Sequence, residues 1–270
     1  MKKIDVRKIG ILVLWILGLS GLAASLAFAT SKEDVVKVEH MSVNITNSDE
    51  NAFIDEEDVK AYLDEQKDAV LNTEKSKVDV NKIEKTLNAH PAIEQADISV
   101  DVNGDVDIEV KQRKPLLRVF NMDGESYYID TQEKLMPLSD KYAARVLVAT
   151  GYIHEPYASR YTLSISDIAN SKVFSEVSVL DDLYALASFI SKDSVLTNLV
   201  QQINVTKDKE FELYPSIGDH KIIFGEAKDI EEKFNNLKVF YTEGLNRTDS
   251  WNKYSIINIK YKNQVVCTKK

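Results

Sequence analysis

The residues best suited to catalysis are few and scattered along this 270-residue chain. Four histidines, His40, His90, His154 and His220, lie in separate segments beside predicted turns or strand ends, and Cys267 is the single cysteine. A nucleophilic triad needs a histidine paired with a nucleophile and an orienting acid, and the spacing supports none. Signatures of a nucleophile elbow, a phosphate loop, a zinc-protease helix or a dinucleotide-binding loop do not occur. The pattern disfavours an enzyme, and an exported hydrolase assembled from distant residues stays the weaker alternative.

The residues that could bind a metal are equally sparse. One cysteine excludes an intramolecular disulfide and, with four histidines, leaves little for a zinc site. The segment Asp101–Asp105 resembles the start of a calcium loop, which needs glycine at its sixth position and glutamate at its twelfth. Val106 and Gln112 stand there instead. We therefore expect a hairpin turn at this segment, a packed thiol at Cys267, and no metal or cofactor.

Composition limits the class of protein further. The chain has 34 basic and 43 acidic residues and a formal net charge of −9, which argues against a general nucleic-acid binder. Its length and its 44% hydrophobic content suffice for one large domain or two modest ones.

The N-terminal stretch has the pattern of a membrane anchor. A basic tail over residues 1–8 precedes a stretch from Ile9 to Ala29 without a charged residue, and its cations are Lys2, Lys3, Arg7 and Lys8. As a helix these residues would span about 31 Å, close to the hydrocarbon thickness of a bilayer. The pattern predicts a transmembrane signal anchor over 9–30 with a cytoplasmic N-terminus. A cleaved signal peptide is the alternative, since Ala27-Phe28-Ala29 resembles a small-residue cleavage site.

Residues 35–112 predict a compact β-α-α-β-β unit. A β-branched alternating segment ends near Ile45, and two helix starts follow, each with an aspartate as N-cap, Asp55 and Asp79. His90-Pro91 ends the second helix, because the residue before proline is pushed out of the α region. Two alternating strands then flank a predicted three-residue loop, 103–105, which pairs Val102 with Val106. We expect a three-stranded sheet covered on one face by two helices.

Residues 113–270 predict a larger mixed α/β unit. Strand patterns occur at 116–120, 127–130, 146–148, 202–206, 210–214 and 221–224, and helical spacing begins at Ser178 and near Ile230. The chain ends in one long predicted strand from Tyr254 to Cys267. The fold class is therefore α+β: a single transmembrane helix, the β-α-α-β-β unit, and a larger mixed domain that ends in a C-terminal strand.

The order of several short segments resembles the FtsQ/DivIB cell-division family. The segments are Val78–Lys85, His90–Ile93, Arg113-Lys114-Pro115, Tyr128–Asp130, Leu135–Leu138, Val146–Gly151, Ile222–Glu226, Glu232–Phe234 with Leu237, and Ile259–Cys267. The first unit resembles the family's POTRA domain and the second its β domain. The ending is similar to that of Bacteroidetes-type members.

This resemblance implies a non-enzymatic divisome scaffold of the inner membrane, with its outer domains in the periplasm and enriched at the division site. It implies FtsB and FtsL as small bitopic partners, bound by β-augmentation, and FtsK as a partner of the POTRA-like domain. The family's partner-binding region maps onto Lys260, Tyr261, Asn263, Gln264, Val265 and Val266. A POTRA-bearing assembly or secretion chaperone is the alternative, and the helices predicted between the strands of the second unit disfavour it.

The residues themselves give this mapping a physical basis. A terminal strand with one free edge presents backbone groups that a partner strand can bind. Lys260 and Lys262 on an otherwise acidic chain suit an acidic partner segment. If the strand is instead internal and paired on both edges, the two lysines are merely solvated.

Overall fold

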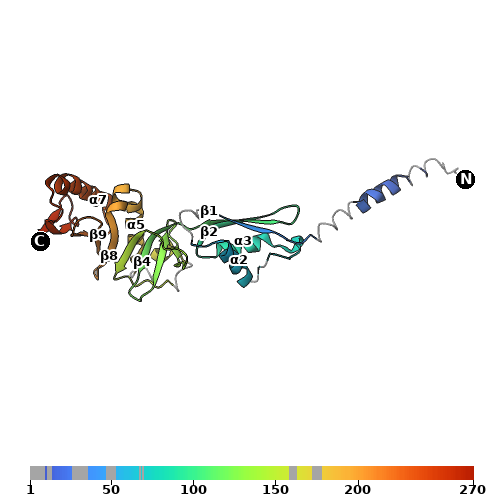
Figure 1. Ribbon diagram of the computed structural model, residues 1–270, viewed down its shortest axis with the longest axis horizontal. Helices are drawn as coiled ribbons and strands as arrows, with labels where there is room; N and C mark the ends of the chain where they lie inside the picture. Colours follow the sequence, from blue (N-terminus) through green and yellow to red (C-terminus); the bar gives the residue numbers. More distant parts are fainter. Residues whose placement is uncertain are drawn as a thin grey trace. The chain divides into compact units, whose positions relative to one another are not determined.

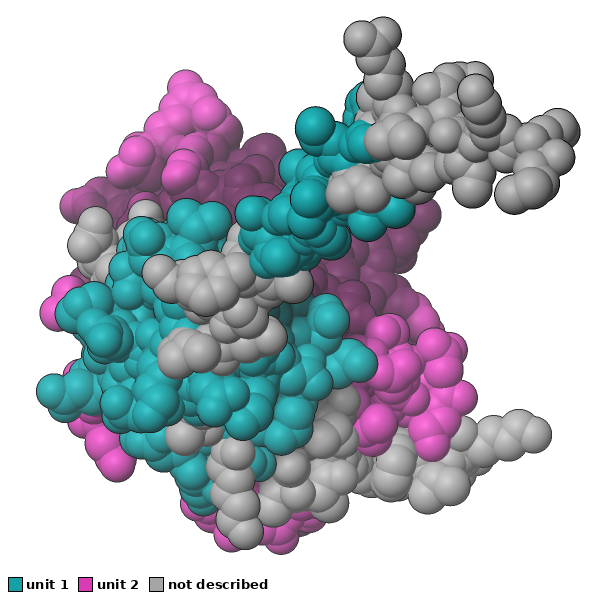
Figure 2. All heavy atoms as spheres, turned by 90° about the vertical axis from the view of Figure 1, so that its right-hand side faces the viewer, with its two compact units in different colours: residues 1–46, 55–89, 95–111 teal, residues 47–54, 90–94, 112–270 magenta. Residues whose placement is uncertain are grey.

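The computed structural model describes residues 10, 14–25, 36–46, 53–66, 68, 70–157, 163–171 and 178–270. The chain forms two compact units, each drawn from several stretches of sequence (Figure 2). The first unit comprises residues 1–46, 55–89 and 95–111. The second comprises residues 47–54, 90–94 and 112–270.

The predicted transmembrane helix requires a correction. Within the stretch 9–30 the structure describes residue 10 and residues 14–25, which are helical. Among the described residues, no helix is both long enough and apolar enough to cross a membrane. The four basic residues assigned to membrane orientation, Lys2, Lys3, Arg7 and Lys8, lie outside the described residues.

The first unit has the predicted β-α-α-β-β order. Its elements are β1 (Met41–Thr46), α2 (Glu56–Glu65), a 3₁₀ turn η1 (Lys75–Lys77), α3 (Val80–Asn88), β2 (Ile93–Val100) and β3 (Val106–Gln112). The sheet order is β1-β3-β2, with β1 parallel to β3, and α2 and α3 lie on one side of it (Figure 1). The Asp55 carboxylate accepts from the Asp58 N–H, and the Asp79 carboxylate accepts from the Lys82 N–H. Both predicted N-caps are thereby confirmed.

The hairpin loop of the first unit differs from the prediction by one position. The Asp101 N–H donates to the Asp105 carbonyl at 2.9 Å, so the three loop residues are 102–104 rather than 103–105. Val102 is 83% exposed and does not pair with Val106. The cause is the Asp101 carboxylate, which accepts from the N–H groups of Asn103 and Asp105 and so stabilises the turn one residue earlier. Moving the loop by one residue shifts the pairing of the two strands by two residues. The apolar residues of both strands therefore stay on one face of the sheet.

The second unit is built on a nine-stranded sheet. The strand order is β12-β11-β10-β9-β8-β7-β4-β5-β6. The strands are β4 (Pro115–Phe120), β5 (Ser126–Asp130), β6 (Leu135–Met136), β7 (Leu147–Gly151), β8 (Val200–Val205), β9 (Phe211–Pro215), β10 (Lys221–Gly225), β11 (Tyr254–Asn258) and β12 (Val266–Lys269). The neighbours β4, β7 and β8 are parallel to one another, as are β10 and β11.

Helices cover one face of this sheet. They are α4 (Ile165–Asn170), α5 (Leu180–Ser191), α6 (Ser194–Leu199), α7 (Ile230–Val239) and a π-helix η2 (Phe240–Asn246). Their buried apolar side chains form one core with the sheet. The other face is polar over β7 to β10, where the Gln202 amide donates to the Thr150 hydroxyl at 2.7 Å and Lys221 pairs with Glu212 at 2.6 Å. At the end of the sheet formed by β5 and β6 this face carries a small apolar cluster, Phe53, Tyr128 and Met136.

A glycine ends β7. Gly151 has φ +99°, and a Cβ there would lie 2.2 Å from the Val205 carbonyl oxygen of the neighbouring strand β8. Only glycine fits this close approach without displacing the backbone.

Two predictions about the second unit are wrong. Ser178 is not the N-cap of α5, which begins at Leu180 after Val179, although the Ser178 hydroxyl accepts from the Leu180 N–H at 3.3 Å. The long C-terminal strand is a hairpin of β11 and β12. Asn263 has φ +57°, and the Asn258 side chain accepts from the Lys260 N–H, so the chain turns where the alternating pattern suggests continuity.

Candidate functional site

The C-terminal strand β12 lies at one end of the nine-stranded sheet. It pairs with β11 through Asn258–Val266, Ile257–Cys267 and Ile256–Thr268. The Ile259 N–H donates to the Ile223 carbonyl of β10, so odd residues of β11 face β10 and even ones face β12. It follows that Val266 and Thr268 bond toward β11. The N–H groups of Cys267 and Lys269 point to the side on which the sheet has no further strand among the described residues.

The structure brings the predicted binding residues together, but around a turn rather than along a strand. Five of them precede β12: Lys260, Tyr261, Asn263, Gln264 and Val265. The sixth, Val266, begins β12 and is 46% exposed. Tyr261 is 50% exposed at the turn. Their role in binding stays a prediction, because the structure places these residues beside an open sheet edge and does not identify a binding partner.

Lys260 is fixed in place by two contacts. Its ammonium pairs with the Glu210 carboxylate, and this hydrogen bond raises the pKa of the Lys260 side chain. Its aliphatic stem covers Gly225, where a Cβ would lie 2.7 Å from the Lys260 Cγ. Sequence reasoning identified Lys260 and missed Glu210 and Gly225, since neither lies near it in the chain.

A small charged hollow of about 250 Å³ lies beside this turn. It is lined by Tyr261, Lys262 and residues from the start of α7, including Lys233. The buried Lys233 ammonium donates to the Glu226 carbonyl at 2.7 Å and lies 4.6 Å from the centre of the Phe224 ring. Burial lowers the pKa of Lys233. The sequence marks Lys233 only as part of the family-like segment Glu232–Phe234, because its spacing is that of any helix-face lysine.

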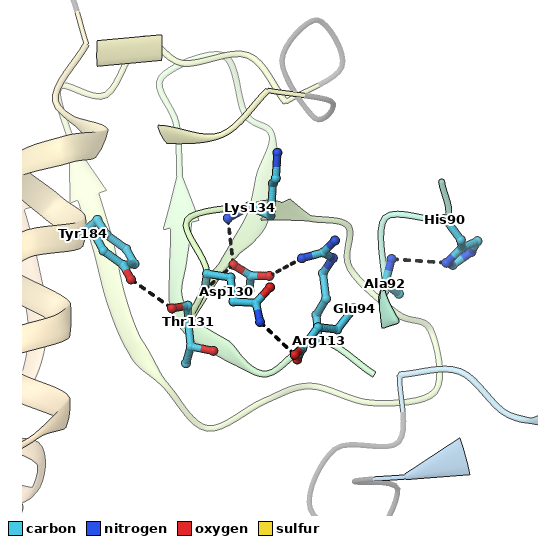
Figure 3. A network of polar contacts seen from close by, with 9 residues as sticks. His90, Ala92, Glu94, Arg113, Asp130, Thr131, Lys134 and Tyr184 are labelled. Carbon is cyan, nitrogen blue, oxygen red and sulfur yellow. Dashed lines mark hydrogen bonds and ion pairs between the residues drawn. The ribbon is translucent and has the colours of Figure 1, made fainter. Parts of the chain in front are cut away.

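A second group of polar residues surrounds Asp130 at the end of β5 (Figure 3). The Asp130 side chain is 2% exposed, and Arg113 donates to its Oδ2 at 2.8 Å. Its Oδ1 accepts from the N–H groups of Gln132 and Lys134 at 2.8 and 2.7 Å. The buried Asp130 carboxylate therefore stabilises the turn after β5 and also binds Arg113, which precedes β4.

The same turn is tied to helix α5. The Tyr184 hydroxyl donates to the Thr131 carbonyl at 2.9 Å (Figure 3). The Thr131 N–H donates to the Lys114 carbonyl at 3.0 Å. The Gln132 amide also donates to Glu94 at 2.8 Å. Arg113 and Asp130 belong to segments that carry the family resemblance. No sequence pattern pairs these two residues with each other.

The histidines and the cysteine do not assemble a catalytic site among the described residues. His40 and His154 are exposed, and His90 accepts from the Ala92 N–H. His220 is buried and its Nε2 lies 2.6 Å from the Tyr241 hydroxyl. Burial lowers the pKa of His220 and raises those of Tyr241 and of the half-buried Cys267 thiol. In the described ranges, no group of three or more histidine, cysteine or acidic side chains could hold a metal ion.

Comparison with known proteins gives two matches that together span both domains. Residues 114–268 match the family model described as FtsQ/DivIB, C-terminal related. Residues 37–111 match the model of a POTRA-like domain. No curated protein matches the chain.

Proposed function

This chain belongs to the FtsQ/DivIB, C-terminal related family, and from that premise we propose that it is a non-enzymatic scaffold that recruits and links division proteins during septum formation. The FtsQ/DivIB proteins are a cell-division family, and the POTRA-like match at residues 37–111 fits the same domain order. We propose a domain boundary between residues 112 and 113. The proposed place of action is the membrane at the division site, with both domains on its periplasmic side.

One observation supports this function most directly: β12 is the terminal strand of its sheet. A partner strand can pair with the outward N–H groups of Cys267 and Lys269 and extend the sheet by one strand. We propose that FtsB/FtsL-type proteins supply this strand. Main-chain bonds would supply affinity, and side chains at the turn, Tyr261 above all, would supply selectivity.

Charge supports an acidic partner segment. Lys262 and Lys269 are exposed beside the open edge, on a chain with a net charge of −9. Lys260 is already paired with Glu210, so it contributes less free charge than the sequence suggests. A local basic strip on an acidic protein steers an acidic partner to this edge. FtsK remains the partner that we propose for the POTRA-like domain, as the family resemblance implies.

The open edge can be tested by removing its donors while keeping its strand. In Cys267→Pro/Lys269→Pro, both outward N–H groups are lost, and proline is tolerated where an edge N–H faces away from the sheet. The matched control is Cys267→Ala/Lys269→Ala, which loses the same side chains and keeps both N–H groups. The tagged full chain is used to capture FtsB/FtsL-type proteins from detergent-solubilised cells.

We expect the alanine variant to capture the partners and the proline variant to lose them. Urea unfolding of both variants shows whether the second unit stays folded. Equal capture by the two folded variants would exclude strand addition at β12. Lost capture by the alanine variant as well would assign recognition to side chains instead of the backbone.

A further inference from the structure

The second unit contains a cleft far from the C-terminal edge. It lies where the parallel strands β4, β7 and β8 begin, beside the end of α5, and has a volume of about 790 Å³. This amino-end cleft starts at β8, four strand spacings from β12, about 19 Å at about 4.8 Å per strand. A ligand here would therefore be separate from a strand added to β12.

The lining of the amino-end cleft combines apolar surface with positive charge. Leu116, Val146, Val148 and Ile190 provide apolar side chains. Among the described residues that line it, Lys114 and Arg145 carry charge, and none is aspartate or glutamate. An acid-free cleft is unexpected on a chain with a net charge of −9. The combination suits a ligand that is both apolar and anionic.

The acids nearest in sequence are engaged elsewhere and do not line the cleft. Asp130 pairs with Arg113 and Asp193 pairs with Lys238. Within the described ranges, no hydrogen bond or ion pair forms to the Arg145 side chain, which is exposed at the cleft. Its planar guanidinium is suited to bind a carboxylate with two parallel hydrogen bonds.

We propose that the amino-end cleft binds a short acidic peptide segment of a partner protein. A carboxylate of that segment would pair with Arg145, near Lys114, and its apolar side chains would pack on the part-exposed Val146 and Val148. The apolar stripe and the volume exceed what a small inorganic anion needs, and charge complementarity selects an acidic segment over a basic one. This second binding site goes beyond the function proposed for β12.

One wall of the cleft is fixed before any ligand arrives. Lys114 and Thr131 line it, and their backbones are bonded to each other. The Thr131 carbonyl is held by Tyr184 of α5, and the next residue back, Asp130, is held by Arg113 (Figure 3). A preformed wall reduces the ordering cost of binding. The contacts of Asp130 with Arg113 and of Thr131 with Tyr184 therefore help to position this binding site.

The test uses random dodecapeptides displayed on phage and selected on the immobilised full chain. Clones that also bind Ser191→Trp are discarded, because Ser191 is an exposed residue of the lining and an indole there would obstruct the cleft. Gln201→Trp, at a second exposed lining position, replaces this variant if urea unfolding shows that Ser191→Trp does not fold. A representative retained peptide is then synthesised and its affinity measured by fluorescence anisotropy.

We expect the retained clones to contain acidic residues among apolar ones. Arg145→Ala should weaken the synthetic peptide about tenfold or more, and Arg145→Lys should recover part of the loss. Arg247→Ala, which removes an exposed arginine outside the cleft, is the matched control and should leave affinity unchanged. Cys267→Pro/Lys269→Pro should also leave it unchanged, which separates this site from β12. A selection without cleft-dependent clones, or with clones that lack acidic residues, would overturn the proposal.

Discussion

The buried pair of Arg113 and Asp130 allows a stability prediction with a defined magnitude. Their side chains are 13% and 2% exposed, and Asp130 also accepts two backbone N–H groups. Asp130→Ala would leave the Arg113 charge buried without its partner. Removing one member of a buried ion pair costs about 3–5 kcal/mol. We therefore expect the second unit of Asp130→Ala to lose about that much free energy of unfolding.

A graded variant separates the charge from the hydrogen bonds. Asp130→Asn keeps one acceptor oxygen for the N–H groups of Gln132 and Lys134 and loses the negative charge that faces Arg113. The loss of one charge-assisted hydrogen bond costs about 1.5–3 kcal/mol. The order of stability should be wild type, then the asparagine variant, then the alanine variant.

The assay follows urea unfolding by the fluorescence of Trp251, which packs against the core of the second unit. Trp15→Phe removes the other tryptophan from the signal. The matched control is Glu243→Ala, which breaks a pair with Arg247 whose side chains are 66% and 78% exposed. An exposed pair on a helix contributes about 0.5 kcal/mol or less.

The result that refutes the reasoning is a loss of less than about 1 kcal/mol in Asp130→Ala, or a loss as large in Glu243→Ala. Either outcome would show that burial does not set the cost of breaking these pairs. A combined Arg113→Ala/Asp130→Ala variant gives the coupling energy of the two side chains directly.

Two further predictions concern a helix cap and a buried histidine. Asp79→Ala removes the acceptor of the Lys82 N–H at the start of α3 and should destabilise the first unit by about 1 kcal/mol, measured by urea unfolding followed by circular dichroism; no change would show that the cap contributes nothing. Burial lowers the pKa of His220, so the unfolded chain binds more protons as the pH falls below the ordinary histidine value of about 6.5. The urea midpoint of the second unit should therefore fall between pH 7 and pH 5, and it should fall less in His220→Gln, whereas equal slopes would exclude His220 as the cause.

The sequence by itself determined the elements whose signals are local. Asp55 and Asp79 cap their helices because a cap needs only a side chain and the next three residues. The strand pattern at 146–148 was also readable from a short apolar run, and it falls at the start of β7, Leu147–Gly151. The order of the family segments identified the two domains that the family models match.

Elements that depend on distant partners needed the tertiary structure. An alternating pattern from Tyr254 to Cys267 fits one long strand and a hairpin equally well. The hairpin forms because its turn is stabilised by the Asn258 side chain and by the ion pair of Lys260 with the distant Glu210. The uncharged N-terminal stretch predicted a transmembrane helix, whereas no helix in the described part of the chain is long and apolar enough to cross a membrane.

The two proposed binding surfaces also depend partly on local sequence and partly on tertiary structure. That a strand ends the chain was predictable, but its place at the edge of a nine-stranded sheet follows from strand order. The amino-end cleft brings Lys114, Arg145 and Ile190 together from three separate parts of the chain. Helix capping and strand alternation depend on a few neighbouring residues, so they can be predicted from local sequence. Strand order, the burial of Asp130 and the shape of a cleft arise only when distant segments pack together.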